Sequence, residues 1–192
     1  CAACPGSVPV LVANGSGGAG DMSGWTLTSN GGDGWKRNGG GYDATDGYFI
    51  TSYGTTTRYQ LVDLVAAGYT EDELDSAPAV TVGEYYKSFF TAGDPYSITI
   101  ELRDAAGAVI QSYASGTIAS TGDWTWAGDT FTGYGPGLRF VYIADSGTDV
   151  EYWAGHYGAM MDGAQVRIAL EASNACGGNG TCEAGAQGDG AC

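Results

Sequence analysis

The sequence predicts an all-β protein: an antiparallel two-sheet β-sandwich of about ten strands, jelly-roll or galactose-binding-like, with one short helix. Three observations predict it. Glycine fills 34 of the 192 positions, a density that indicates many turns between short strands. The 13 tyrosines and 5 tryptophans need burial or a ligand, which argues against a disordered chain. Apolar and polar residues alternate with a period of two, so each strand has one face on a core.

The clearest strand runs from Tyr96 to Arg103, where apolar and polar side chains alternate without interruption. The turn residues 104–107 follow, and the apolar run 109–113 predicts the returning strand of a hairpin. Similar runs predict strands at 8–13, 24–29, 48–53, 59–65, 79–89, 125–131, 138–143 and 165–170.

One segment, residues 70–77, predicts a helix of one or two turns. Thr70 and Glu73 have the spacing of a capping box, in which each side chain bonds the backbone N–H of the other residue.

The chain divides into three parts. Residues 1–8 form a tail of small residues, residues 9–172 form the sandwich, and residues 173–192 form a Gly- and Cys-rich tail without large apolar side chains. All five cysteines lie in the tails: Cys1, Cys4, Cys176, Cys182 and Cys192. Cysteines placed in this way predict disulfides and an oxidising compartment, with one thiol left over or paired with another chain. A zinc site at Cys1 and Cys4 is the alternative, but it needs further ligands that the tails offer only at irregular spacings.

Charge excludes two classes of partner. The chain carries 22 acidic and 7 basic residues, a net charge of −15, which disfavours nucleic acid and anionic lipid. No apolar run is long enough to span a bilayer. Because the sequence starts at a cysteine, we consider a processed product, a lipid-modified N-terminus and a segment of a longer protein as open alternatives.

The segment YWAGHYG, residues 152–158, is dense in aromatic residues. Exposed Tyr and Trp rings suit sugars, whose apolar C–H faces stack on them, whereas the alternative is an aromatic cluster that seals the sandwich edge. His156, the single histidine, is a candidate glycan contact rather than a catalytic group. In the earlier stretch GWTLTSNGGDGW we expect Trp25 and Trp35 to cap the core, with Asp33 bonded to the turn backbone.

The sequence does not predict an enzyme. It has no G-x-S-x-G, H-E-x-x-H or G-x-x-x-x-G-K motif, and no pair of carboxylates stands out for glycoside hydrolysis. No metal site is predicted; Ca²⁺ at Asp43 and Asp46, or at Asp145 and Asp149, is a weaker alternative to a solvated acidic face.

Three stretches carry motifs that occur together in one family: GWTLTSNGGDGW, YFITSYGTTTRYQLVDLVAAGY and TFTGYGPGLRFVYIADSGTDVEYWAGHYG. In unbroken order over residues 10–170, they resemble the F-box-associated domain, the sugar-recognising half of certain ubiquitin-ligase adaptors. The resemblance implies a ten-stranded antiparallel sandwich whose loops at one end bind the inner chitobiose of N-linked glycans.

The resemblance also implies which residues bind the sugar. The Tyr-Trp pair of the family matches Tyr152 and Trp153, and an aromatic contact matches Tyr53. The acidic contact residue of the family falls at Thr91, with Asp94 as a shifted substitute. The lysine that follows the Tyr-Trp pair in glycan-binding members is replaced by Ala154, which departs from the family pattern.

Two functions follow as hypotheses. The first is a secreted, extracellular, lectin-like module, of bacterial type, that binds glycans or glycoproteins. The second is a structural subunit of an extracellular fibre or tandem array, in which copies of the chain are linked through their Cys-bearing tails. The residues before position 10 are too few for an F-box, so we expect no ubiquitin-ligase partner.

Overall fold

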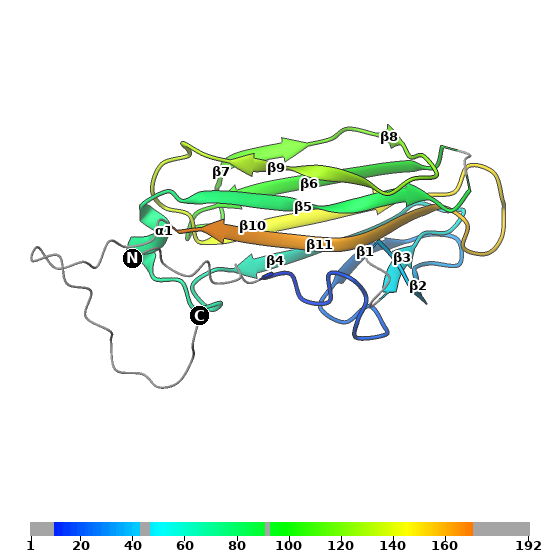
Figure 1. Cartoon of the computed structure of the whole chain (residues 1–192), viewed down its shortest axis with the longest axis horizontal. Coiled ribbons are helices and arrows are strands. Elements are labelled where there is room, and N and C mark those ends of the chain that lie inside the picture. The colour runs from blue at the N-terminus through cyan, green and yellow to red at the C-terminus, as the bar shows by residue number, and fades with distance from the viewer. Residues whose placement is uncertain (1–9, 43–46, 91–92, 171–192) are drawn as a thin grey trace, which may run out of the picture.

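The computed structural model describes residues 10–42, 47–90 and 93–170, which form two facing β-sheets and one short helix (Figure 1). Within these residues the strands are β1 (Thr26–Asn30), β2 (Lys36–Gly39), β3 (Gly47–Ile50), β4 (Thr56–Asp63), β5 (Ala79–Ser88), β6 (Pro95–Arg103), β7 (Val109–Ala114), β8 (Ile118–Ala119), β9 (Thr125–Phe131), β10 (Phe140–Gly147) and β11 (Ala159–Ala169). The predicted all-β sandwich is confirmed.

Both sheets are antiparallel. In the described residues, one sheet has the order β1-β4-β10-β6-β7, with β8 paired to β6, and the other has the order β2-β3-β11-β5-β9. Strands β10 and β11 are therefore the middle strands of their sheets. Since they follow each other in the chain, the segment that joins them connects the centres of both layers.

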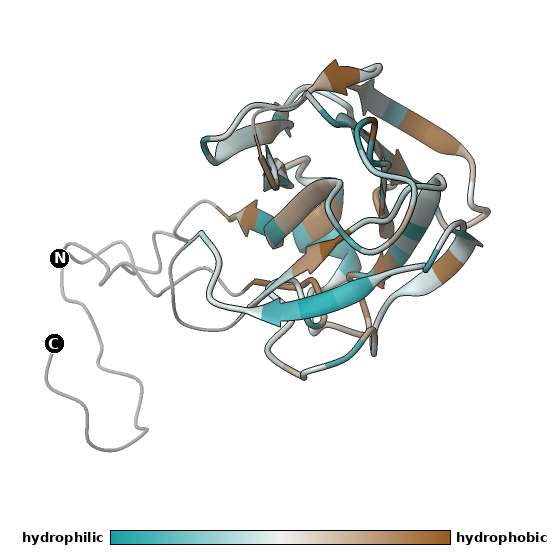
Figure 2. Ribbon diagram, turned by 90° about the vertical axis from the view of Figure 1, so that its right-hand side faces the viewer, coloured by the Kyte–Doolittle hydropathy of each residue, from teal (hydrophilic) through white to brown (hydrophobic). Residues whose placement is uncertain are grey.

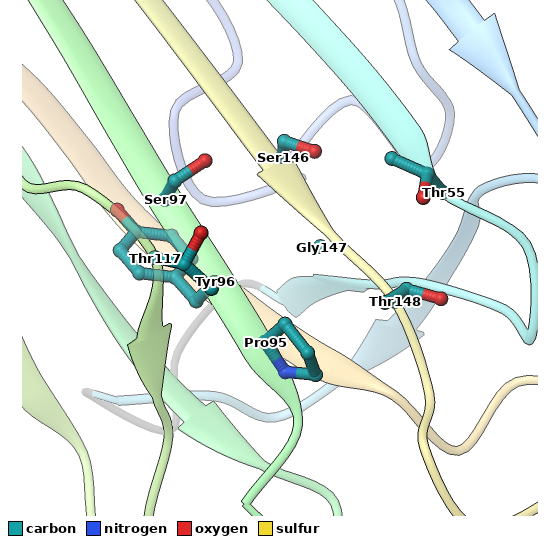
Figure 3. Close-up of a pocket in the computed structure, with 8 residues that line it drawn as sticks. All are labelled: Thr55, Pro95, Tyr96, Ser97, Thr117, Ser146, Gly147 and Thr148. Carbon is teal, nitrogen blue, oxygen red and sulfur yellow. The ribbon is translucent and has the colours of Figure 1, made fainter.

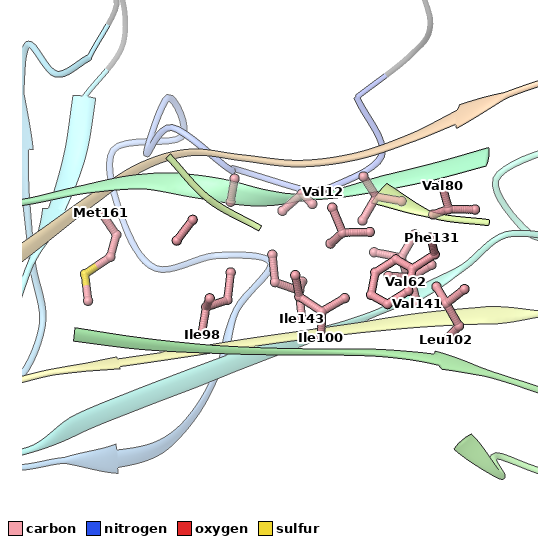
Figure 4. Packing of buried hydrophobic residues seen from close by; sticks show 14 of the residues in the cluster. Val12, Val62, Val80, Ile98, Ile100, Leu102, Phe131, Val141, Ile143 and Met161 are labelled. Atoms are coloured by element: carbon pink, nitrogen blue, oxygen red, sulfur yellow. The ribbon is translucent and has the colours of Figure 1, made fainter. Parts of the chain in front are cut away.

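The core lies between the two sheets, where the inward positions of facing strands meet (Figure 4). On β6 the alternation is complete: Ile98, Ile100 and Leu102 are at most 1% exposed, while the residues between them are partly exposed. In Figure 2, brown hydrophobic and teal hydrophilic stretches follow one another along several strands. Each fully buried Leu or Ile contributes about 1.5–3 kcal/mol to folding, so the period of two sets the fold.

The predicted helix is confirmed as α1 (Glu71–Asp75), and its capping box is present as the sequence indicates. The Thr70 Oγ1 accepts from the backbone N–H of Glu73 at 3.2 Å, and the Glu73 carboxylate accepts from the backbone N–H of Thr70 at 2.8 Å. Within the described residues no helix is long and apolar enough to cross a membrane.

One strand prediction is wrong, and the short strands β2 and β8 are absent from the predicted ones. Of the expected strand 8–13, the described residues 10–13 form a loop, although the Leu11 N–H still bonds the Val166 carbonyl at 3.2 Å. Strand β2 was not predicted, because its residues KRNG contain no apolar side chain to reveal a period of two. The tails, their five cysteines and the assembly hypothesis that rests on them lie outside the described residues.

A charged cluster lies inside the sandwich. Arg58 on β4 donates from Nε to both carboxylate oxygens of Asp145 at 2.8 and 3.1 Å, and its Nη2 lies 3.4 Å from Glu84. All three side chains are fully buried. The guanidinium carbon lies 3.7 Å from the Trp25 ring centroid and 4.8 Å from that of Trp35, so the expectation that both rings belong to the core is confirmed.

Candidate functional site

Four loops meet at the end of the sandwich that lies on the right in Figure 1, and we call this end the loop end. They are residues 31–35, 51–55, the described part of 89–94, and the long segment 148–158 between β10 and β11. Most of the residues that the sequence singled out lie here.

Ser52 ties three of these loops together. Its Oγ accepts from the Asp33 N–H at 2.9 Å and donates to the Gly155 carbonyl at 2.7 Å. Its own carbonyl accepts from the Asp149 N–H at 2.9 Å. Since Ser52 is fully buried, the long segment is anchored on the end of β3 at two points.

Asp33 and His156 add two more anchors. The Asp33 Oδ2 accepts from the Gly155 N–H at 2.8 Å, so this carboxylate bonds the opposite loop rather than its own turn, contrary to expectation. The His156 Nε2 lies 3.2 Å from the Asp33 carbonyl oxygen. His156 therefore holds the loop, whatever further contacts it makes.

Two buried carboxylates shape the first half of the segment. The Asp149 Oδ1 accepts from the N–H groups of Glu151 at 2.7 Å and Tyr152 at 3.1 Å, which fixes a tight turn. The Asp94 Oδ1 accepts from the Val150 N–H at 3.3 Å. Asp94 is 1% exposed, and burial raises the pKa of its carboxyl group. The structure thus places Asp94 beneath the loop, whereas Thr91 lies outside the described residues.

Four aromatic rings pack on one another at this end: Phe89, Phe90, Tyr152 and Tyr157, which we call the tip cluster. The Tyr152 and Tyr157 centroids are 5.0 Å apart, and Phe90 lies 5.8 Å from Tyr152. Phe89 packs edge-on against Tyr157 at 5.5 Å. Tyr152 remains 41% exposed, so one side of the cluster faces solvent.

Trp153 follows the tip cluster and is 86% exposed. Tyr53 is 40% exposed in the neighbouring loop, next to Ser52. A large apolar ring left in water forgoes the free energy of its burial, while the backbone around it is held by the hydrogen bonds above. The loop end therefore presents aromatic rings on a fixed backbone. Its segments 31–35, 51–55, 89–94 and 148–158 contain no Lys or Arg.

A shallow pocket of about 160 Å³ lies beside this end, on the six-stranded sheet (Figure 3). Hydroxyl groups of Thr55, Ser97, Ser146 and Thr148 line it, and Tyr96 beneath is 1% exposed. It offers hydrogen bonds but no exposed ring. None of the predicted site residues lines it.

The Ca²⁺ alternative at Asp145 and Asp149 does not hold, because both oxygens of Asp145 accept from Arg58 inside the core. Across the described residues no group of three or more His, Cys, Asp or Glu side chains is placed to bind a metal ion. Asp43 and Asp46 lie outside those residues.

Comparison with known families decides what this domain is. The model of the F-box associated region, FBA, matches residues 10–168. The chain belongs to the F-box associated family. F-box only protein 2 of Bos taurus is 34% identical over 163 residues, which cover 77% of this chain and 55% of that protein. F-box only protein 44 of Homo sapiens is 32% identical over 157 residues, which cover 75% of this chain and 62% of that protein. This F-box associated chain thus spans a little over half the length of these relatives.

Solved structures share the fold of this F-box associated domain. The enzymatically active domain of bacteriophage CBA120 tailspike protein 4 superposes with a TM-score of 0.61 and 15% identity, over 83% of this chain and 21% of that one. The module TmCBM61, solved in complex with β-1,4-galactotriose, gives a TM-score of 0.54 and 14% identity, over 85% of this chain and 99% of that one.

Proposed function

We propose that the loop end is a lectin-like site that binds a neutral glycan, with Trp153, Tyr152 and Tyr53 as the contact residues and an N-acetylglucosamine-containing chain as the ligand. The observation that carries the proposal is Trp153: its ring is 86% exposed, yet it lies on a loop anchored by buried polar groups.

The chemistry of the loop end fits a sugar. A pyranose presents an apolar C–H face, which stacks on an aromatic ring, and hydroxyls at its edge that need hydrogen bonds. The exposed ring of Trp153 supplies the first, and the hydroxyl of the partly exposed Tyr152 supplies the second. Because the loops contain no Lys or Arg, the ligand is expected to carry no negative charge.

Rigidity raises the affinity that such a site can reach. The Asp149 turn and the Ser52 contacts hold the Tyr-Trp pair in place before binding, so little ordering free energy is lost when the sugar arrives. The sandwich fold shared with an oligosaccharide-bound module, and the glycan recognition implied by the family resemblance, support the same function.

The protein acts in this proposal as a binding module and not as an enzyme, at an extracellular or cell-surface location. The location rests on the five cysteines of the tails, which are typical of an oxidising compartment.

Isothermal titration with chitobiose and with a high-mannose glycan tests the function. We expect the unmodified chain to bind and Trp153→Ala to weaken binding at least about tenfold, which corresponds to about 1.4 kcal/mol. Trp153→Phe keeps a stacking ring and should retain part of the affinity. Tyr59→Ala, which removes a ring packed on Tyr142 of the neighbouring strand in the six-stranded sheet, is the matched control and should bind normally. No heat from the unmodified chain, or full affinity in Trp153→Ala, would contradict the proposal.

A further inference from the structure

A second set of aromatic side chains lies away from the loop end, on the outer face of the five-stranded sheet. This set, which we call the sheet face, comprises Tyr42, Tyr48, Tyr85, Trp124 and Trp126. In Figure 1, strands β5, β9 and β11 are turned toward the viewer. Of the described residues, Gly41 and Tyr42 lie over β11, where the Tyr42 N–H bonds the Asp162 carboxylate. The alternation along β5 points Tyr85 outward, because its neighbours Glu84 and Tyr86 are buried.

Two glycines in the middle of paired strands support Trp126. Gly83 on β5 pairs with Gly128 on β9. A Cβ at Gly83 would lie 2.6 Å from the Trp126 Cζ2, and one at Gly128 would lie 3.0 Å from the same atom. The indole therefore rests directly on the backbone of the sheet. Glycine inside a strand weakens it, so this pair is best explained by the ring that it admits.

Tyr85 and Tyr42 extend the platform. Their rings stack with centroids 3.5 Å apart, and Trp126 meets Tyr85 edge-on at 5.2 Å. A cavity of about 260 Å³ opens beside the stack and is lined in part by Gln165 and Arg167 of β11. Tyr42 is 48% exposed, so the stack is open to solvent on one side.

Tyr48 and Trp124 form the other end of the sheet face. Their centroids are 6.2 Å apart, although two strands, β11 and β5, separate β3 from β9. Neighbouring strands are about 4.8 Å apart, so these rings lean toward each other over the strands between them. Ile50 on β3 and Met160 on β11, which pair with each other and point outward, are at most 5% exposed.

Three basic residues lie on this face, and the described Asp123 precedes Trp124 at its edge. Lys36, Lys87 and Arg167 supply three of the seven basic residues, in a protein of net charge −15. The Lys87 Nζ lies 5.6 Å from the Trp124 ring centroid. Of the carboxylates, Asp162 is buried under the Tyr42 N–H, and Asp129 pairs with Val82, whose side chain is in the core.

Lys87 and Arg167 lie on either side of the Tyr85 ring along the strands. Arg167 pairs with Thr81 and Met160 pairs with Lys87, so the two basic residues stand six positions apart along β5. At about 3.3 Å per residue this separation is about 20 Å, and Tyr85 lies between them. A ligand that meets both cations must be extended, carry more than one anionic group, and present apolar surface to the rings between.

We propose that the sheet face is a second carbohydrate site, which binds an acidic polysaccharide chain of uronate type. Sugar rings stack on Trp126 and on the Tyr42–Tyr85 pair, while uronate carboxylates bond Lys87 and Arg167. Arg and Lys each form charge-assisted hydrogen bonds with carboxylates. This site does not depend on the loop end, where the rings have no basic neighbours.

Isothermal titration with hexagalacturonate tests the proposal, and its fully methyl-esterified form is the uncharged control. We expect the acid form to bind at least about tenfold more tightly than the ester, and added salt to weaken it. Trp126→Ala and the double variant Lys87→Gln/Arg167→Gln should each lose at least about tenfold in affinity. Arg103→Gln, which removes a partly exposed cation from the six-stranded sheet, should bind normally.

Trp153→Ala should leave hexagalacturonate binding unchanged, which separates this site from the loop end. Circular dichroism checks the fold of each variant, and the double variant changes only surface cations if Trp126→Ala proves unstable. Absence of binding by the unmodified chain, equal affinity for acid and ester, or full affinity in the double variant would each overturn the proposal.

Discussion

The rings around Arg58 and the rings at the loop end use the same residue types for opposite purposes. Trp25, in the core, is 8% exposed and lies 3.7 Å from the guanidinium of Arg58. Trp153, at the loop end, is 86% exposed. One ring helps to bury a charge, and the other is held in water by a loop that is itself fixed.

The difference lies in what fixes each region. In the core, the carboxylates and the rings must compensate the buried charge of Arg58, because an unpaired buried charge costs several kcal/mol. At the loop end, backbone hydrogen bonds to Ser52, Asp33 and Asp149 fix the loop, and the exposed rings are not needed for it. The core cluster, which consists of Arg58, Asp145, Glu84 and the rings packed on them, should therefore govern stability, and the loop end should govern binding.

The largest effect is expected from Arg58→Met. Removal of the guanidinium leaves Asp145 and Glu84 buried without their cation, which should lower the free energy of unfolding by about 3–5 kcal/mol. Urea unfolding followed by tryptophan fluorescence measures it. Arg103→Met, which removes the partly exposed partner of Glu101, is the control and should cost about 1 kcal/mol or less. Equal losses in the two variants would contradict the role given to the core cluster.

A smaller effect, with a distinct pH dependence, is expected from Glu84→Gln. Burial and the neighbouring Asp145 carboxylate raise the pKa of Glu84 well above its ordinary value of 4.5. The folded state then holds this proton more tightly than the unfolded chain does. The stability that protonated Glu84 contributes is present below pH 4.5 and is lost as the pH rises through the raised pKa of Glu84.

Glutamine resembles the protonated acid and does not titrate. Relative to the unmodified chain, Glu84→Gln should therefore gain stability as the pH rises from 4.5, and unfolding curves at a series of pH values measure this difference. Glu101→Gln, which changes the partly exposed ion pair of Glu101 with Arg103, is the control. A difference that stays constant or falls with pH would show that Glu84 is ionised in the folded protein.

The smallest change in stability is expected from Asp149→Ala. It removes the acceptor of the Glu151 and Tyr152 N–H groups and should lower the free energy of unfolding by about 1 kcal/mol. It should also weaken glycan binding, because the Tyr-Trp pair would no longer be held in place before the ligand arrives. Glu151→Ala removes an exposed carboxylate two residues away and should change neither quantity. Normal chitobiose affinity in a folded Asp149→Ala variant would show that the turn does not organise the site.

The sequence predicted the sandwich well, because the period of two on strands such as β6 reflects burial directly. It also located the aromatic segment 152–158, whose composition is unusual for a loop. It did not reveal that Asp94 lies beneath the loop or that Ser52 joins three loops, because these contacts link residues far apart in the chain. The predicted strand 125–131 contains Trp126 and begins directly after Trp124, but the sequence did not show that both rings lie on one face with Tyr85, since that depends on how the strands pair.

The long segment 148–158 joins β10 to β11, the two strands that are hydrogen-bonded on both sides in the middle of their sheets. Such strands exchange their amide hydrogens most slowly, so the loop is attached to the last parts of the domain to open. We expect an exchange of this loop to leave both layers intact where the new sequence keeps its bonds to Ser52 and Asp94. In this domain, one connection between the two most protected strands carries most of the exposed rings of the proposed site.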